Sequence, residues 1–271
     1  MLGVAAMSRL FIFGLGYSAG YVADLARARG WEVIGTGRHG GLSFDDEGTV
    51  RLALADSNYV LSSVPPGGEG LDPVLDRYGD ALSRQWLGYL SSTGVYGDTG
   101  GAWVDESAPT GTGRRTARAE ADAAWLALGA RVFRLPGIYG PGRSPLDRIR
   151  AGKAHRIDQP GQVFSRIHVE DIASSVMAAR GAPPGAYNLA DDLPASQNAV
   201  IEEASRLLGI QPPPLQTVDQ AGLSPAARSF YAENRRVANG KARRVLGWAP
   251  RYATYREGLR ALVSARDGAA G

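Results

Sequence analysis

Ser8-Arg-Leu-Phe-Ile-Phe-Gly14-Leu-Gly16-Tyr-Ser-Ala19, at residues 8–19, is the stretch that decides the fold. A short apolar run meets two glycines, and an alanine-rich stretch then continues to Arg29. The apolar run predicts a buried strand, the alanine-rich stretch predicts a helix, and residues 31–36 predict a second strand. Together they make a β-α-β unit of about 30 residues, which is the usual size of such a unit.

The pattern Gly14-x-Gly16-x-x-Ala19 predicts a cradle for a phosphate group. Gly14 permits the tight turn, Gly16 lets the backbone approach a pyrophosphate, and Ala19 lets the helix pack close to the sheet. The amide groups of Tyr17 and Ser18 open that helix and face the anion. We therefore expect a dinucleotide to bind here, although glycines also serve turns that hold no ligand.

The end of the second strand indicates which dinucleotide is preferred. Proteins that bind NAD usually carry Asp or Glu there, which accepts hydrogen bonds from the adenosine ribose. This chain instead has Gly35-Thr-Gly-Arg38-His39, with no carboxylate before Asp45. Arg38 can pair with a 2′-phosphate through charge-assisted hydrogen bonds. The sequence therefore favours NADP(H) over NAD(H), with a solvated surface arginine as the alternative.

Apolar runs alternate with helical stretches as far as residue 192. Strands are expected at 59–64, 86–92, 130–135 and 186–189, and a helix at 114–128. This alternation predicts an α/β doubly wound Rossmann fold, with a parallel sheet covered on both faces. Further helices are expected near 196–209, 224–232, 239–247 and 254–266. We expect a Rossmann core over residues 8–192, with 141–165 inserted into a small, mainly helical C-terminal substrate lobe formed by 193–271.

Composition excludes several classes of function. The chain has 271 residues, a formal charge of +3 and no cysteine, which excludes disulfides, cysteine-ligated zinc and thiol nucleophiles. All but two of the 30 basic residues are arginine, yet no block of like charges indicates a nucleic-acid partner. No apolar run approaches the length of a membrane span, and no His/Asp/Glu cluster has metal-ligand spacing. A cytoplasmic protein with a small-molecule partner is expected.

Several motifs recur in a fixed order beyond the glycine pattern. They are Ser91-Ser92-Thr-Gly-Val-Tyr96-Gly97, Arg134-x-x-x-Ile138-Tyr-Gly-Pro-Gly142, His168-Val-Glu-Asp171 and Leu246-Gly-Trp248-x-Pro250. With these motifs the chain resembles the extended short-chain dehydrogenase/reductase family, which is NAD-dependent epimerase/dehydratase-like. The likeness is strongest to an atypical, YeeZ-like branch, and it allows a homodimer.

The resemblance implies catalytic positions, and the chain departs from them. Ser92 stands where the family has its catalytic Ser/Thr, and Tyr96 is the nearest phenol in sequence. In the family a Tyr-x-x-x-Lys pair on the next helix supplies the acid, because a phenol with a pKa of about 10 needs a nearby ammonium. Ala117 and Ala121 occupy those two positions here. Arginines at 114, 115 and 118 are alternative anion-binding groups, with a solvated helix face as the simpler interpretation.

Other strand ends complete the expected site. Ser63 and Val64 end a core strand beside the glycine turn, where residues usually line the cofactor. Pro136 and Gly137 follow another core strand and should border the nicotinamide. The resemblance places Arg143 and Arg166 in the region where extended family members bind phosphorylated substrate groups. His168 is interpreted as structural rather than catalytic.

Three classes of function follow from these observations. The first is an NADP(H)-dependent oxidoreductase or epimerase-like enzyme that acts on a carbonyl or sugar-derived small molecule. The second is a non-catalytic NADP(H)-sensing regulator, which the missing dyad favours. The third is an interaction protein with a vestigial pocket, in which no cofactor binds.

Overall fold

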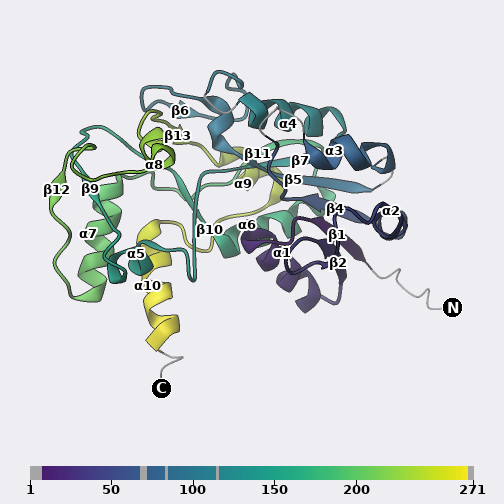
Figure 1. Cartoon of the computed structure of the whole chain (residues 1–271), viewed down its shortest axis with the longest axis horizontal. Coiled ribbons are helices and arrows are strands. Elements are labelled where there is room, and N and C mark those ends of the chain that lie inside the picture. Colours follow the sequence, from purple (N-terminus) through teal and green to yellow (C-terminus); the bar gives the residue numbers. More distant parts are fainter. Residues whose placement is uncertain (1–7, 68–71, 83–84, 114–115, 268–271) are drawn as a thin grey trace.

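A parallel sheet lies at the centre of the molecule (Figure 1). The computed structural model describes residues 8–67, 72–82, 85–113 and 116–267. The sheet has seven strands in the order β11-β7-β5-β4-β1-β2-β3. Their bounds are β1 Arg9–Phe13, β2 Glu32–Thr36, β3 Gly41–Leu42, β4 Tyr59–Ser62, β5 Trp86–Ser92, β7 Arg131–Leu135 and β11 Gly185–Asn188. The predicted α/β Rossmann fold is confirmed.

Strand β1 shows why the sheet is covered on both faces. Leu10 and Ile12 point into one buried cluster, whereas Phe11 and Phe13 point into another. The first cluster is closed by α1 (Tyr17–Ala28), α6 (Val169–Ala178) and α9 (Gly240–Leu246). The second is closed by α2 (Glu47–Ala55), α3 (Pro73–Tyr78) and α4 (Thr116–Ala127). Alternate side chains of one strand therefore form two hydrophobic layers.

The order of the strands creates a crevice at the carboxyl end of the sheet. The chain moves from β1 to β2 on one side and then returns to β4 on the other. The loops that follow β1 and β4 therefore diverge between neighbouring parallel strands. Open α/β sheets bind ligands at such a switch point, outside the carboxyl ends of the strands.

A smaller lobe lies beside this end of the sheet. Its own core joins α5 (Pro145–Arg150), α7 (Gln197–Leu208) and α10 (Tyr255–Asp267), which Figure 1 shows away from the sheet. The helix α9 belongs to the expected lobe in sequence, yet it packs in the first cluster under the sheet. The boundary at residue 192 therefore stays a prediction, and the chain returns to the core after it.

Three short parallel strand pairs lie outside the main sheet in the described part of the chain. They are β8 (Gly137–Tyr139) with β10 (Arg166–His168), β6 (Trp103–Val104) with β13 (Arg236–Val237), and β9 (Arg156–Ile157) with β12 (Leu215–Gln216). One of them, β6 with β13, joins the core range to the lobe range. One further helix, α8 (Pro225–Phe230), lies above the lobe in Figure 1. Within the described ranges, no helix is long and apolar enough to cross a membrane.

Candidate functional site

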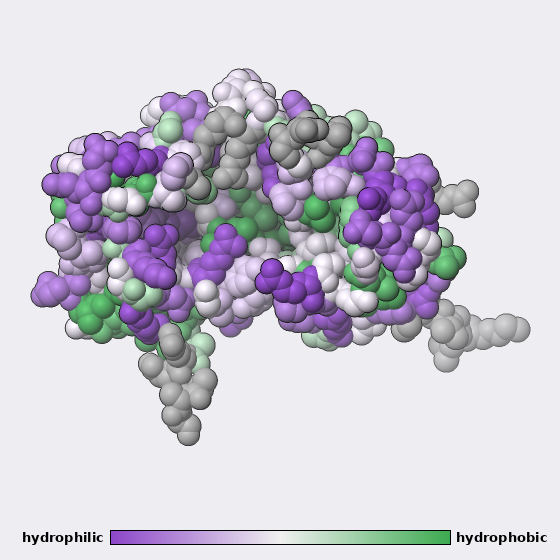
Figure 2. Space-filling model, viewed as in Figure 1, coloured by the Kyte–Doolittle hydropathy of each residue, from purple (hydrophilic) through white to green (hydrophobic). Residues whose placement is uncertain are grey.

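A cleft of about 1820 Å³ runs from the glycine turn to the lobe. Figure 2 shows this hollow between the two parts of the molecule, with apolar residues on its floor. The sequence-predicted residues that line it are Gly14, Gly16, Tyr17, Ser18, Arg38, Ser63, Val64, Ser92, Pro136, Gly137, Arg143 and Arg166. Ala19 and Tyr96 do not line it. The fold thus brings together residues that are scattered over more than half of the sequence.

The glycine turn fits closely against the end of β4. Gly14 has a φ of +75°, and a Cβ atom there would lie 2.9 Å from Cγ2 of Val64 and 3.2 Å from Oγ of Ser63. Ser63 also donates a hydrogen bond to the Gly14 carbonyl. Both the backbone conformation and the space therefore require glycine at this position.

The start of α1 leaves room for an anion. The position before this helix is Gly16, which is exposed, and the nearest atom to a Cβ built there is the Gly14 carbonyl oxygen at 3.8 Å. Among the described residues no side chain caps the helix, and its first turn contains no acidic residue. The free amide groups carry the positive end of the helix dipole. These residues therefore fit a dinucleotide pyrophosphate, while Ala19 packs beneath them in the core.

The end of β2 is fixed against the same turn. Gly14 N and Leu15 N donate to Oγ1 and the carbonyl of Thr36, at 3.3 and 2.7 Å. Arg38 follows two residues later, exposed and on the wall of the cleft. It forms no ion pair within the described part of the chain, so its guanidinium is available to a ligand phosphate.

Ser92 closes β5 at the cleft. Its Oγ accepts a hydrogen bond from Gly94 N at 3.1 Å, which begins the short 3-10 turn Thr93–Tyr96. The side chain is half-buried and lines the cleft. Because the oxygen accepts from the backbone, its own hydrogen can be donated to a ligand.

Tyr96 faces the protein interior. Its hydroxyl donates to Oδ1 of Asn188 at 2.7 Å and accepts from Arg134 at 2.9 Å. Arg134 also forms a buried ion pair with Asp122 at 2.6 Å, and Ser91 donates to the same carboxylate. Burial raises the pKa of Tyr96, which further disfavours its phenolate. The catalytic role of Tyr96 stays a prediction that this position does not support.

The helix α4 carries neither partner of the expected dyad. Ala117 and Ala121 lie where the resemblance places the tyrosine and the lysine, and Ala121 is buried. Arg118 lines the cleft and donates to the Tyr89 hydroxyl at 2.7 Å. The other two arginine candidates, at 114 and 115, lie outside the described residues.

His168 has a structural place at the back of the cleft. Its Nδ1 accepts from Glu170 N at 3.3 Å and so caps α6, and its ring lies between those of Tyr139 and Tyr252. Burial lowers the pKa of His168 to about 4, so the imidazole is neutral at physiological pH. This agrees with the structural interpretation of the histidine.

Asp191, next to this region, should make stability depend on pH. Burial raises its pKa from 3.8 to about 7, and among the described residues its Oδ2 has no hydrogen-bond partner. Between about pH 4 and pH 7 Asp191 is ionised in the unfolded chain but stays protonated in the folded chain. The free energy of unfolding therefore falls as pH rises through this range. Asp191→Asn should remove this loss and be more stable than the wild type by about 4 kcal/mol at pH 7, because each pKa unit corresponds to about 1.4 kcal/mol.

Urea unfolding at pH 4 and pH 7 measures this difference. Asp158→Asn, at an exposed carboxylate, is the matched control and should follow the wild type at both pH values. Equal stability of Asp191→Asn and wild type at pH 7 would contradict the assignment.

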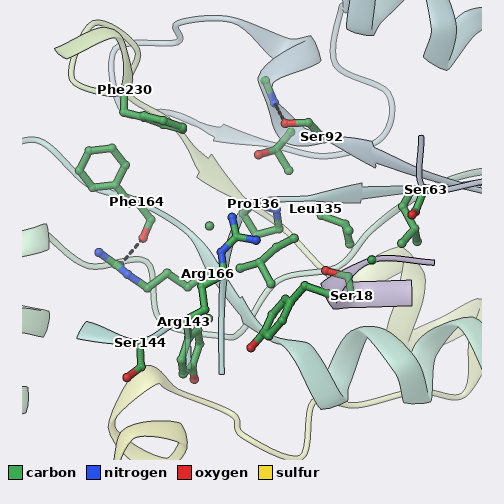
Figure 3. Close-up of a pocket in the computed structure, with 18 of the residues that line it drawn as sticks. Ser18, Ser63, Ser92, Leu135, Pro136, Arg143, Ser144, Phe164, Arg166 and Phe230 are labelled. Carbon is green, nitrogen blue, oxygen red and sulfur yellow. Dashed lines mark hydrogen bonds between the residues drawn. The ribbon is translucent and has the colours of Figure 1, made fainter. Parts of the chain in front are cut away.

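The substrate side of the cleft contains two arginines in different surroundings. Arg143 is exposed, and its guanidinium lies 5.7 Å from the centre of the Tyr17 ring. Tyr17 in turn donates to the Pro141 carbonyl at 3.1 Å, which links the glycine-turn helix to the loop that carries Arg143. Arg166 is buried and reaches across the lobe end (Figure 3).

Sequence reasoning missed the aromatic part of this wall. Phe164 and Phe230 line the cleft and are labelled in Figure 3 on the lobe side. Both lie in irregular or short elements with no motif, and the only signal is an aromatic residue in an otherwise polar segment. Within the described ranges, no group of His, Cys, Asp and Glu could hold a metal ion.

Comparisons with known proteins show relatives of this chain. No protein-family model matches the chain. Protein YeeZ of Escherichia coli K12 is 30% identical over 243 residues, which cover 76% of this chain and 86% of YeeZ. A 3-diazoavenalumate denitrifying reductase from Streptomyces is 30% identical over 171 residues, covering 58% of this chain and 55% of that protein.

Solved structures show the same fold. A conserved protein of unknown function from Silicibacter pomeroyi superposes with a TM-score of 0.85 and 41% identity, covering 96% of this chain and 99% of that one. Human epimerase family protein SDR39U1, solved with NADPH, has a TM-score of 0.75 at 17% identity and covers 94% and 99%. The dTDP-glucose 4,6-dehydratase of Bacillus anthracis, solved with NAD, has a TM-score of 0.76 at 17% identity and covers 96% and 97%.

The glycine turn, the motif order and the likeness to YeeZ over most of both chains agree with one another. The chain belongs to the family of protein YeeZ, and its fold is that of the epimerase and dehydratase structures.

Proposed function

We propose that the protein is an NADP(H)-dependent oxidoreductase or epimerase-like enzyme that acts on a carbonyl or sugar-derived small molecule. One observation carries the proposal. The uncapped start of α1, at Gly16, opens into the same cleft as Ser92 and the lobe. A dinucleotide held at the helix start can therefore extend toward a polar hydroxyl and a separate substrate space.

The residues of this chain divide the binding task. The turn at Gly14 and Gly16 would hold the pyrophosphate, and Arg38 the 2′-phosphate. Residues 63–64 and 136–137 would border the nicotinamide, which donates or accepts a hydride when bound. Ser92 would orient the reacting oxygen of the substrate by hydrogen bonding. Cytoplasmic location and a homodimer stay predictions.

Charge on the reacting oxygen needs a group other than the missing phenol. Arg118 on the cleft wall can donate hydrogen bonds while it keeps its proton, because a guanidinium is charged at all physiological pH values. In this scheme Arg118 stabilises the oxyanion and water supplies the proton.

The relatives support nicotinamide chemistry without fixing the substrate. SDR39U1 was solved with NADPH and the Bacillus dehydratase with NAD, and the Streptomyces relative is named as a reductase. The two structures hold one cofactor of each kind, NADPH and NAD. The preference for NADP(H) in this chain rests on Arg38.

A second candidate is a non-catalytic NADP(H)-sensing regulator. The observation that favours it is the combination of Ala117 and Ala121 with a Tyr96 hydroxyl that is already bonded inside the core. In such a protein the glycine turn would still bind the dinucleotide, but the Tyr-x-x-x-Lys pair that supplies the acid would be absent.

Two measurements separate the candidates. Calorimetric titration with NADPH tests the cradle, and no binding at millimolar concentration would sink both candidates in favour of an interaction protein. Stereospecific transfer of deuteride from labelled NADPH to a carbonyl compound, followed by mass spectrometry, supports the enzyme. Binding of NADPH without transfer to any carbonyl compound tested supports the regulator.

Arg38→Ala should remove most of the preference for NADPH over NADH. Loss of a charge-assisted pair with the 2′-phosphate should weaken NADPH binding about tenfold, while NADH binding should change little. Dissociation constants for both cofactors, measured by calorimetry, give the ratio.

Arg29→Ala is the matched control, because Arg29 is also an exposed arginine of the first β-α-β unit but does not line the cleft. It should keep the wild-type ratio. If Arg38→Ala keeps that ratio too, the dinucleotide assignment is wrong.

A further inference from the structure

We infer that the lobe end of the cleft binds the flat aromatic ring of a substrate that also carries a single carboxylate. The lobe end is the part of the cleft lined by Arg143, Lys153, Phe164, Arg166 and Phe230. The inference rests on the proposed function, because it names the substrate class for the same cleft.

Positive charge gathers at the lobe end. Among the described residues Arg143 and Lys153 form no ion pair, and the guanidinium of Arg143 lies over the Tyr17 ring. In Figure 3 the Arg143 side chain points into the space between Pro136 and the lobe. Arg143 and Lys153 are therefore available to pair with a ligand anion in this space, since neither pairs with a carboxylate of the described chain.

Arg166 adds a buried charge to the same wall. It is 7% exposed, and its guanidinium donates to the carbonyls of Phe164 and Ala195 and to Gln197, at 2.8, 2.9 and 3.1 Å. None of these hydrogen-bond partners is a carboxylate, although the buried Asp191 lies close enough to raise the pKa of Arg166. Burial lowers the pKa of Arg166 to about 10, so the group is still charged at neutral pH. A nearby ligand anion would offset part of the free energy that this burial costs.

The neighbouring helix α5 favours a carboxylate over a phosphate. Asp147 lines the cleft, and its Oδ2 accepts from Ser144 N and Ser144 Oγ at 3.0 and 2.7 Å, while Ser144 Oγ accepts from Asp147 N. This capping box already satisfies the start of the helix with a negative side chain. The Asp147 carboxylate repels a doubly charged phosphate more strongly than a singly charged carboxylate.

Aromatic rings supply the other half of the subsite. Phe164 packs edge-on against Tyr231, with ring centres 5.5 Å apart. Phe230 is 51% exposed although it is a large apolar side chain. In Figure 3 the Phe164 and Phe230 rings both face the space above Arg143 and Arg166. A flat ring placed there gains apolar burial and aromatic contact together.

The subsite and the reactive end are at different places in the cleft. Ser92 and Pro136 lie toward the cofactor side in Figure 3, and the two phenylalanines lie toward the lobe. An aromatic acid bound by its ring and carboxylate would therefore present a second substituent, such as an aldehyde, toward Ser92.

Calorimetry on the full chain tests the inference, with and without saturating NADP⁺. The probe is 4-carboxybenzaldehyde. Its three comparators are 4-(hydroxymethyl)benzaldehyde, which lacks the charge, 4-formylcyclohexanecarboxylate, which lacks the aromatic ring, and uridine monophosphate, a nucleotide whose anionic group is a phosphate. The probe should bind at least about tenfold more tightly than each comparator.

Each other outcome overturns part or all of the inference. If the uncharged aldehyde binds as tightly as the probe, the subsite does not require a carboxylate. If the cyclohexane acid binds as tightly as the probe, the subsite does not require an aromatic ring. Tighter binding of uridine monophosphate assigns the subsite to a phosphate. Absence of probe binding removes the subsite.

Variants locate the binding in the cleft. Arg143→Gln should weaken the probe about tenfold and leave the uncharged aldehyde unchanged. Phe230→Leu should weaken the probe and leave the cyclohexane acid unchanged. Arg256→Gln is the matched control, because Arg256 is also an exposed arginine over a tyrosine ring, at 5.3 Å from Tyr255, but lies outside the cleft. Wild-type probe affinity in Arg143→Gln would overturn the assignment.

The same titrations distinguish this inference from the proposed function. Binding of the probe without binding of NADP⁺ or NADPH would remove the proposed function and leave the subsite. Binding of the cofactor without binding of the probe would leave the proposed function and remove the subsite.

Discussion

Replacing Gly16 with aspartate is expected to weaken NADPH binding by at least about a hundredfold, which corresponds to about 2.8 kcal/mol. The new side chain would stand at the exposed start of α1, where the backbone amides form the proposed phosphate cradle. Its bulk would fill the space that the glycine leaves, and its negative charge would repel the pyrophosphate and occupy the positive end of the helix dipole.

The backbone at this position allows the substitution without strain. Gly16 has φ of −106° and ψ of −156°, which any residue can adopt, and the nearest atom to a built Cβ is 3.8 Å away. The variant should therefore fold, and its melting temperature should stay close to that of the wild type in the absence of cofactor. The aspartate side chain can also cap the free helix start, as such residues do at this position.

Gly16→Asn separates charge from bulk. Asparagine has nearly the same shape as aspartate, so it should also weaken NADPH, but less than aspartate does. Calorimetric dissociation constants for both variants decide the matter. If Gly16→Asp binds NADPH as tightly as the wild type, the pyrophosphate does not lie at this helix start.

Asp122→Ala is expected to have the largest effect on stability, a loss of about 3 to 5 kcal/mol. Asp122 and Arg134 form an ion pair at 2.6 Å with 2% and 4% of their side chains exposed. The variant would leave the Arg134 guanidinium charged and buried without its acid, and would also remove the acceptor for Ser91. Breaking a buried pair from one side has this large cost because the remaining charge stays desolvated.

Urea unfolding followed by far-UV circular dichroism measures the loss. Asp24→Ala is the control, because Asp24 pairs with Arg27 at 3.3 Å on the surface, where 78% and 48% of the side chains are exposed. An exposed pair contributes at most about 1 kcal/mol, so this control should remain close to the wild type. A loss in Asp122→Ala no larger than that of the control would show that the buried pair contributes little.

The ion pair also explains the position of Tyr96. Arg134 donates to both Asp122 and the Tyr96 hydroxyl, so the network ties α4, β7 and the turn after Ser92 together. Proximity in sequence made Tyr96 the natural candidate for a catalytic phenol. Its orientation depends on contacts with Arg134 and Asn188, which no local pattern reveals.

The sequence by itself determined six of the seven strands of the main sheet and the glycine turn. The strands β1, β2, β4, β5 and β7 lie within the ranges predicted from apolar runs, β11 begins one residue before its predicted range, and the glycine turn leads into α1 as expected. These features depend on local physics: short apolar runs bury themselves, and Gly14 adopts a positive φ that other residues avoid. Sequence patterns also indicated the lobe helices α7, α8 and α10, but not α5.

Some elements went unpredicted because their local signals are weak. The helices α2 and α3 and the strand β3 were missed. The helix α2 has nine residues and only Val50 and Leu54 buried, and α3 has six residues. Too few periodic apolar positions exist in such short helices to distinguish them from loops.

Tertiary structure alone decided the aromatic wall of the cleft. Phe164, Arg166 and Phe230 come from a loop, a three-residue strand and a short helix, and only the docking of the lobe brings them to one wall. It likewise turned Tyr96 inward, and it carried α9 back under the main sheet. Side-chain direction and neighbours at long sequence separation depend on packing between elements, which no local stretch encodes.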